Sequence, residues 1–411
     1  MSIPPVDRLW TRDFVLANAA NFFQAMIFYL LMTTMALYTV ERFGASDVAA
    51  GAASTAYIAG AVVARLFAGR TLDLIGRRRQ FLWAIGAAFV VSFLYFPVTS
   101  LPALIAVRVI HGVTFGVGST TLSAAIQAII PPWRRGEGTG YFGMSATLAT
   151  AVGPAVAVQL TRTLGYDALF WASVVCSGLG LVFGLLLRLP EPGRGPHRHT
   201  TDPHNPDRRR WHPRRIVAGM VEPAVVPSSA TVLLLGVCHS AILAFLQPTA
   251  VQRGEENAAS VFFLVLALFA LVTRLWVGRV QDIRGDNAVI YALLALYAAG
   301  LAVLALTDGA WGLYAAGALC GLGFGGIIPC FQAITVALVP PANVGMATST
   351  FFIALDVGTA AGAVVLGAIV PWAGFGGMFL AAAALVGVAV VVYWLTHGRR
   401  PEATTPRASL R

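Results

Sequence analysis

Ionisable side chains inside apolar stretches are the residues of this sequence most able to do chemistry. Asp356 lies near the middle of the apolar run 343–370, and Arg108 lies about eight residues into the run 101–126. A charge at the centre of a bilayer costs at least about 2.5–3.5 kcal/mol, so such residues usually face a protein interior or a water cavity and mark an ion pathway. A carboxyl there can bind and release a proton, whereas arginine keeps its charge and tunes a partner. We predict that both residues take part in proton coupling; a static ion pair or strut is the alternative.

Two histidines extend this set. His111 follows Arg108 by about one helical turn, and His239 lies in the middle of the apolar run 229–250. Histidine is the side chain that titrates near neutral pH. Each is therefore a candidate for proton transfer, with a simple hydrogen bond between helices as the alternative.

A polar stripe marks the first apolar run. Asn18, Asn21, Gln24 and Phe28 fall within about 120° of one helix surface at 100° per residue. Such a stripe on an apolar helix predicts a face toward a cavity. Packing of amides between helices is the alternative.

The elements that must position these residues are membrane spans. The chain has 411 residues, 57% of them hydrophobic and 11% charged, against about 25% charged in soluble domains. A spanning helix needs about 20 mostly apolar residues. The sequence predicts an all-α integral membrane protein with these twelve spans: 13–38, 48–68, 81–98, 101–126, 138–161, 167–187, 229–250, 258–277, 288–306, 309–335, 343–370 and 372–395.

Charge placement predicts the orientation. The formal charge is +10 and all 28 basic residues are arginine, but they cluster in short loops between spans, which argues against nucleic-acid binding. The positive-inside rule then places both termini in the cytoplasm of an inner (plasma) membrane. No cleavable signal peptide, disulfide or metal pattern is evident, and we expect no cofactor. The four cysteines are interpreted as small buried hydrophobes.

A polar segment divides the spans into two sets of six. We predict an N-terminal half (1–187), a basic cytoplasmic linker (188–228), a C-terminal half (229–396) and a cytoplasmic tail (397–411). The linker is expected to be largely disordered, with a short amphipathic piece near 211–220. Its histidines (His197, His199, His204 and His212) could bind a metal, but their irregular spacing favours a solvated linker.

The two halves share a pattern at a constant offset of 209 residues. The first set is Arg65, Leu66, Gly69, Arg70, Asp73 and Gly76, and its counterparts are Arg274, Leu275, Gly278, Arg279, Asp282 and Gly285. The same offset relates Gly136 to Gly345 and Gly153 to Gly362. The halves are therefore predicted to be tandem repeats, and the polar stretch 69–79 to be a short loop at the membrane surface.

These motifs resemble those of the major facilitator superfamily. Gly69 to Arg78 is similar to the family signature G-x-x-x-D-[RK]-x-G-[RK]-[RK], with Leu74 in place of a basic residue. Arg108 to Gly112 resembles the R-x-x-x-G element of proton-coupled members. Residues 149–154 resemble the antiporter signature G-x-x-x-G-P, with Gly153 and Pro154 present and Ala149 replacing the first glycine. The overall resemblance is to bacterial drug-efflux members.

The resemblance implies roles for further residues. It implies a cytoplasmic latch between the halves, with Asp282 and Arg279 the weaker counterpart of Asp73. The latch set is Gly69, Arg70, Asp73, Gly76, Arg77, Arg78, Gly278, Arg279 and Asp282. The family cavity implies these substrate-binding residues: Asn21, Gln24, Phe28, Gln247, Phe331, Gln332 and Phe352. Amides and aromatic rings suit an amphipathic, partly aromatic ligand.

We therefore predict a proton-coupled exporter of small amphipathic organic molecules, working by alternating access and functional as a monomer in the lipid bilayer. The first alternative is a symporter that imports a small metabolite on the same fold. A polytopic membrane enzyme is disfavoured because no paired-acid metal motif or nucleophile constellation is present. A transporter-like receptor would usually carry an added soluble domain, and the linker is too short and polar to be one.

Overall fold

The computed structural model describes residues 8–189 and 221–407, without the side chains at 47, 48, 50, 73, 74, 256, 257 and 260. The long helices in these ranges are α1 (Arg12–Phe43), α2 (Asp47–Ile75), α3 (Arg77–Phe93), α4 (Leu101–Ile126), α5 (Arg135–Leu164), α6 (Tyr166–Leu186), α8 (Val226–Gln252), α9 (Glu256–Arg284), α10 (Asp286–Leu306), α11 (Ala310–Ala337), α12 (Val344–Gly367) and α13 (Val370–Tyr393).

The prediction of an all-helical membrane protein is confirmed. Of the described helices, 11 are long and apolar enough to cross a membrane. α3 has 17 residues and begins with three arginines, so it falls just short of a full span. Helices suit this setting because each satisfies its backbone hydrogen bonds internally. The ends are capped locally: the Thr11 side chain accepts from Phe14 N–H at the start of α1, and Gly44 (φ 58°) ends it.

The prediction of a short loop over 69–79 is wrong. α2 continues through Ile75, α3 begins at Arg77, and Gly76 with φ 95° makes the turn between them. α9 and α10 are likewise separated by Gly285 with φ 85°. The arginines do not stop the helix because a 29-residue helix is about 43 Å long and extends beyond a hydrocarbon core of about 30 Å. Polar residues at such an end can stay helical while they reach water.

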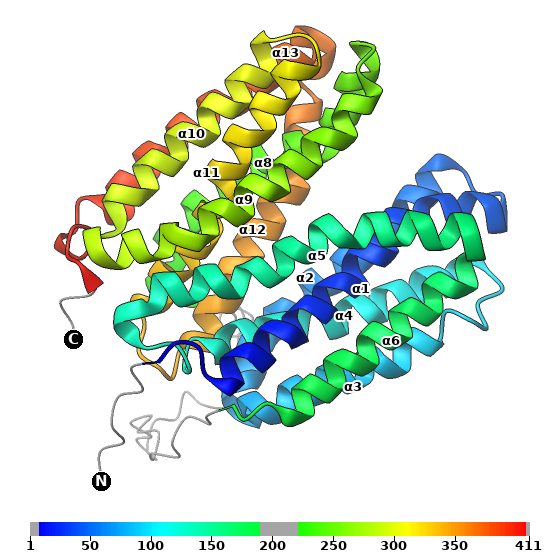
Figure 1. Ribbon diagram of the computed structural model, residues 1–411, viewed down its shortest axis with the longest axis horizontal. Helices are drawn as coiled ribbons and strands as arrows, with labels where there is room; N and C mark the ends of the chain where they lie inside the picture. The colour runs from blue at the N-terminus through cyan, green and yellow to red at the C-terminus, as the bar shows by residue number, and fades with distance from the viewer. Residues whose placement is uncertain (1–7, 190–220, 408–411) are drawn as a thin grey trace, which may run out of the picture.

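The helices form two groups (Figure 1). α1–α6 pack together in one group and α8–α13 in the other, each around its own buried apolar residues. The groups meet mainly where α2 contacts α12 and α5 contacts α9. They converge at the end where α1 begins and α13 finishes, and diverge toward the opposite end. We call the converging end, which carries Arg12, Gly76, Gly285 and residues 394–407, the base.

The chain after α13 folds back onto the base. A π-helical turn at Trp394–Gly398 and a 3-10 turn at Pro401–Ala403 follow the helix. Asn287, at the start of α10, donates from its side chain to the Gly398 carbonyl at 2.7 Å. The described part of the predicted tail is thus packed against the C-terminal group. The predicted linker falls largely on residues 190–220, including the piece near 211–220 and its four histidines, which lie outside the described residues.

Candidate functional site

An ion pair joins the two groups of helices. Arg65 of α2 donates through its Nη1 atom to the Oδ2 atom of Asp356 in α12. The Arg65 side chain is 7% exposed and that of Asp356 is 19% exposed. Arg65 lies ten residues before the end of α2 and Asp356 twelve residues after the start of α12, so both are about 15–18 Å from the base at 1.5 Å per residue. Both residues therefore lie about three helical turns inside their helices.

The surroundings of the pair hold Arg65 firmly. Its guanidinium carbon lies 4.9 Å from the ring centroid of Phe352, one turn before Asp356 on α12. Ser349, on the same helix, donates its hydroxyl to the Arg65 carbonyl. The Nε atom of Arg65 is buried and has no hydrogen-bond partner. Asp356, a predicted ion-pathway residue, thus pairs with Arg65 and not with Arg108 or either histidine.

A second arginine crosses between the groups. Arg274 of α9 donates from Nη1 to the Gly143 carbonyl of α5 and from Nε to the Gly325 carbonyl of α11 at 2.8 Å. Arg274 stands 209 residues after Arg65. Both arginines therefore sit at contacts between groups, but the second has carbonyl oxygens where the first has a carboxylate.

Glycines bring the groups together at the base. A Cβ atom added at Gly69 would lie 2.8 Å from the Gly345 carbonyl oxygen, and one added at Gly136 would lie 2.5 Å from that of Gly278. Such backbone approach excludes a side chain. These pairs also correspond at an offset of 209, since Gly69 matches Gly278 and Gly136 matches Gly345.

Asp282 binds the start of a helix from the other group. Its two carboxylate oxygens accept from Gly136 N–H and Glu137 N–H of α5, both at 2.9 Å. A carboxylate at a helix N-terminus gains from charge-assisted hydrogen bonds and from the helix dipole. The side chain is 5% exposed. Asp282 therefore makes two direct hydrogen bonds between the groups. It was predicted to be the weaker counterpart of Asp73, whose side chain lies outside the described residues.

The arginines of the first motif differ in their surroundings. Arg77 is 4% exposed and donates to the Pro341 carbonyl, just before α12, at 3.3 Å. Arg78 donates to the Leu185 carbonyl within its own group at 3.3 Å. Arg70 and Arg279 are exposed. The contact of Arg77 thus joins the two groups, whereas that of Arg78 with Leu185 lies within one group.

Arg108 and His111 lie inside the N-terminal group. Arg108 is fully buried and donates to the carbonyls of Ala53 and Ser54 at 3.2 and 3.1 Å, with its guanidinium 4.8 Å from the Tyr57 ring centroid. His111 shares a 3.1 Å hydrogen bond between Nδ1 and the Tyr95 hydroxyl. Arg108 Nη1 and His111 Nε2 are buried without a partner. The pair is separate from Asp356, so the predicted coupling residues do not form one cluster.

His239 has Phe324 as its ring partner, not Asp356. Its ring stacks on Phe324 of α11 with centroids 3.8 Å apart, and its Nδ1 atom is buried without a partner. The contact joins α8 and α11 within the C-terminal group.

The predicted substrate residues are scattered over both groups. Asn21 donates to the Ser145 hydroxyl of α5 at 2.8 Å, and Phe28 stacks on Phe115 of α4. Gln24 is 4% exposed and neither of its amide atoms has a partner. Orphaned buried amide atoms are uncommon, which keeps Gln24 a candidate ligand contact.

The C-terminal members of the predicted set lie in three settings. Phe352 is beneath Arg65, and Gln332 is 6% exposed with an unpartnered Nε2 atom. Gln247 is exposed. Phe331 is fully buried in the core of the C-terminal group against Tyr393, at 5.7 Å between centroids, so it lines no open wall. Phe352 is the one that the structure places at the ion pair.

The antiporter-like pair lies where α5 meets α1. A Cβ atom added at Gly153 would lie 2.6 Å from the Cβ atom of Tyr29, and Pro154 stands inside α5. Proline removes one backbone donor from the helix. This element therefore allows close packing of α1 on α5 at a weakened point of α5.

Arg65 is the functional candidate that sequence reasoning missed. In the predicted span 48–68 it lies three residues from the end, where a long side chain can reach the interface, so the sequence carried no signal of a buried charge. Because α2 continues to Ile75, Arg65 lies ten residues inside the observed helix. Among the described residues, no three histidine, cysteine or acidic side chains gather closely enough to hold a metal ion.

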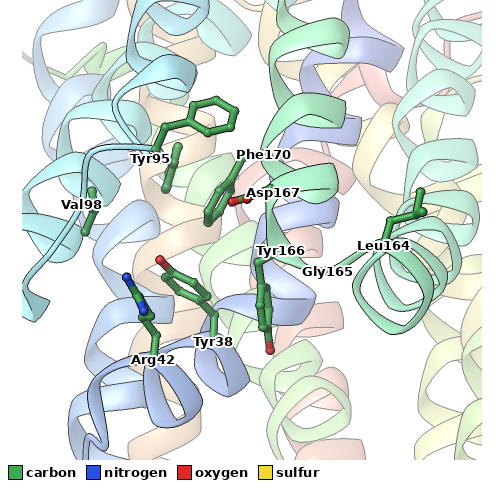
Figure 2. A pocket seen from close by; sticks show the side chains of 10 residues that line it. Tyr38, Arg42, Tyr95, Val98, Leu164, Gly165, Tyr166, Asp167 and Phe170 are labelled. Carbon is green, nitrogen blue, oxygen red and sulfur yellow. The ribbon is translucent and has the colours of Figure 1, made fainter.

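A cavity of about 360 Å³ lies at the end opposite the base, within the N-terminal group. Figure 2 shows Tyr38 and Arg42 of α1 facing Tyr166 and Phe170 of α6. The Tyr166 hydroxyl donates to Glu41 at 2.8 Å. None of the predicted site residues lines this cavity, and it does not reach α2 or α12.

The contacts that join the two groups, at Arg65 and Arg274 and at the base, can be compared with those of known proteins. The model of the Major Facilitator Superfamily matches residues 17–311 and, in a second match, 255–410. The chain belongs to the major facilitator superfamily (MFS). It is 24% identical over 400 residues to the uncharacterized MFS-type transporter YhhS of Shigella flexneri, covering 95% of this chain and 93% of YhhS. An uncharacterized MFS-type transporter of Burkholderia mallei (strain SAVP1) is 25% identical over 375 residues, covering 86% and 85%.

Solved MFS structures share the fold. The human organic anion transporter MFSD10 (TETRAN) has a TM-score of 0.77 at 17% identity, covering 93% of this chain and 98% of that chain. The proton:xylose symporter XylE has a TM-score of 0.73 at 14% identity, covering 96% and 97%. The matched proteins are transporters, so this MFS chain is a multi-pass membrane transporter with a small-molecule substrate.

Proposed function

We propose that this protein is a proton-coupled secondary transporter that exports small amphipathic organic molecules by alternating access. The Arg65–Asp356 pair carries the proposal. It joins α2 to α12 about three helical turns from the base and includes a carboxyl group that can exchange a proton. Protonation of Asp356 removes the charge that holds Arg65, so proton binding changes the strength of a contact between the two groups.

In this proposal the halves are parallel six-helix repeats that rock about the site between them. Arg65 and Arg274, which correspond at the 209-residue offset, both occupy contacts between the groups, which supports the repeat. The base faces the cytoplasm of the inner membrane because the arginine-rich segments gather there. The contacts of Asp282 and Arg77 then close the cytoplasmic side, while the diverging helices leave the other side apart.

The substrate class follows from the predicted substrate residues of the two groups. Phe352 and Phe28 offer aromatic faces, and Gln24 and Gln332 offer buried amide atoms without partners. This mixture suits a ligand that is partly apolar and can accept or donate hydrogen bonds. Gly153 and Pro154, which resemble part of an antiporter signature, favour export.

The test is a transport assay in inside-out vesicles. After energisation acidifies the lumen, a pH-sensitive dye is quenched, and a panel of lipophilic cations, antibiotics and organic anions is added. Antiport gives dequenching for at least one compound, and Asp356→Asn abolishes it. Absence of a response to any compound, with folded protein present, would contradict the proposal. Dequenching that survives Asp356→Asn would keep antiport and move the coupling to His239 or His111.

A symporter of a small organic anion is the second candidate. When Asp356 is protonated, Arg65 keeps its positive charge, its aromatic neighbour Phe352 and a buried Nε donor without a partner. An anion could take the place of the carboxylate, so proton and anion would bind together. Among proteins of the same fold, MFSD10 is described as an organic anion transporter and XylE as a proton symporter. Alkalinisation of the medium when an organic anion is added to right-side-out vesicles would favour this candidate.

A further inference from the structure

The second half lacks a cation that the first half uses at the base. Arg77 begins α3 and donates across the groups to the Pro341 carbonyl. The position 209 residues later is Asp286, which begins α10. An acid cannot make the same contact, because it offers no donor to a carbonyl oxygen. It also adds a buried negative charge close to Asp282, whose own carboxylate is buried at 5% exposed.

The C-terminal tail supplies a cation at this place. Arg407 contacts Asp286 Oδ1 through Nη2 at 2.9 Å and approaches Asp282 Oδ1 through Nη1 at 3.6 Å. Its side chain is 10% exposed, and those of both acids are 5% exposed. Two buried carboxylates that share one guanidinium are each less costly than an unpaired charge.

The tail is fastened to the C-terminal group by further contacts. His397 Nε2 lies 2.8 Å from Asp286 Oδ2, and the Gly398 carbonyl accepts from Asn287. A Cβ atom added at Gly285 would lie 3.0 Å from the Ala403 carbonyl oxygen, so the tail lies directly on the α9–α10 turn. These contacts hold Arg407 against the carboxylate that binds the start of α5.

We infer that Arg407 is a positioning residue for Asp282, so that the C-terminal tail forms part of the closure between the two groups at the base. The guanidinium pairs with Asp286 and, from 3.6 Å and without a hydrogen bond, attracts the Asp282 carboxylate that accepts from Gly136 and Glu137 of α5. Loss of Arg407 frees Asp282 to turn away from α5 and weakens the closure. The inference rests on the proposed function in that it takes the two groups to separate at the base during transport.

The test is hydrogen–deuterium exchange of the full chain in lipid nanodiscs. Arg407→Gln is compared with Arg400→Gln, which removes the same charge from an exposed tail residue. We expect Arg407→Gln to speed exchange in the 135–140 peptide about tenfold, equivalent to about 1.4 kcal/mol, while Arg400→Gln leaves it unchanged. Arg407→Lys should restore most of the protection, because it keeps the charge. Asp282→Asn serves as the positive control, since it removes the acceptor charge itself.

The pattern of exchange separates a positioning role from simple packing of the tail. Faster exchange confined to 394–407 and the start of α10, with 135–140 unchanged, would overturn the inference while Asp282→Asn still raised exchange at 135–140. If Asp282→Asn also left 135–140 unchanged, the Asp282 contact would not control the base, and this part of the proposed function would fail together with the inference. A melting temperature measured for each variant shows whether it is folded.

Discussion

Arg65 and Arg274 occupy corresponding places in the two halves, and each reaches across to the other group of helices. Their partners also correspond in position but not in chemistry. Position 352, under Arg65, is phenylalanine, and its counterpart 209 residues earlier is Gly143, whose carbonyl accepts from Arg274. Asp356 has Thr147 as its counterpart.

The difference separates a fixed contact from one that can change. A carbonyl oxygen does not titrate, so the hydrogen bonds of Arg274 keep the same strength over the physiological pH range. In the proposed mechanism Asp356 takes up a proton, and the bond of Arg65 then weakens. The common geometry brings the groups together, and the proposal assigns proton coupling to the contact that includes the acid. In two related repeats, a position where corresponding side chains differ is therefore a candidate site for proton coupling.

The largest effect is expected from Asp356→Asn. It leaves the buried guanidinium of Arg65 without a counter-ion, and breaking such a pair costs about 3–5 kcal/mol. Because asparagine cannot bind and release a proton, proton-driven flux should fall to the level of vesicles without the protein. The measurement is dye dequenching in inside-out vesicles. Asp308→Asn is the matched control, because the Asp308 side chain is 88% exposed, and it should retain full flux.

Moving the acid sharpens the comparison. In the double variant Thr147→Asp with Asp356→Asn, the carboxylate stands at the corresponding place in α5, where Thr147 is 8% exposed in the group that meets Arg274. If the surroundings of Arg65 and Arg274 are equivalent in the two halves, we expect about a tenth of the original flux to return. Flux no higher than that of Asp356→Asn would show that the surroundings of Arg65, such as Phe352, matter as much as the pair itself.

The glycine contacts at the base give the next largest effect. Gly278→Ala would place a methyl group into the Gly136 carbonyl, whereas Gly69→Ala would place one 2.8 Å from the Gly345 carbonyl oxygen. Overpacking costs about 1–3 kcal/mol, so we expect both to lower the melting temperature and speed exchange at the base, Gly278→Ala more. Gly387→Ala is the control, because its added Cβ meets nothing within 4 Å. Equal behaviour of all three would show that the groups are not in close contact at the base.

The sequence predicted the helices and the glycines at the contacts between the halves, but not which side chains pair across those contacts. Apolar run lengths predicted all twelve helices in order, and the 209-residue offset selected Gly69 and Gly278, which do lie at the contacts. Which helices cross depends on three-dimensional packing, so nothing in the spacing indicated that Arg65 would meet Asp356. Charge alone was also a poor guide to helix ends, since α2 continues past Arg70.

The tail was the least predictable part. Residues 397–407 show no apolar periodicity, so the sequence indicated only a polar end after the last span. Its order comes from individual contacts to the α9–α10 turn, above all those of His397 and Arg407 with Asp286. The offset of 209 residues places Asp286 where the first half has Arg77, but the residue that compensates for it, Arg407, lies 121 positions away.

The smallest effect is expected from lysine at the two crossing arginines. Arg274 uses two different nitrogens for carbonyls on α5 and α11, and one ammonium cannot reproduce that planar fork. Arg274→Lys should therefore lose about one hydrogen bond, about 0.5–1.5 kcal/mol, and lower the melting temperature by a few degrees with proton-driven flux unchanged. Arg65→Lys keeps a charge opposite Asp356, so flux should fall only about two- to fivefold, at up to about 1 kcal/mol. A large loss of flux in Arg274→Lys, with the melting temperature preserved, would contradict the assignment of Arg274 to a fixed contact.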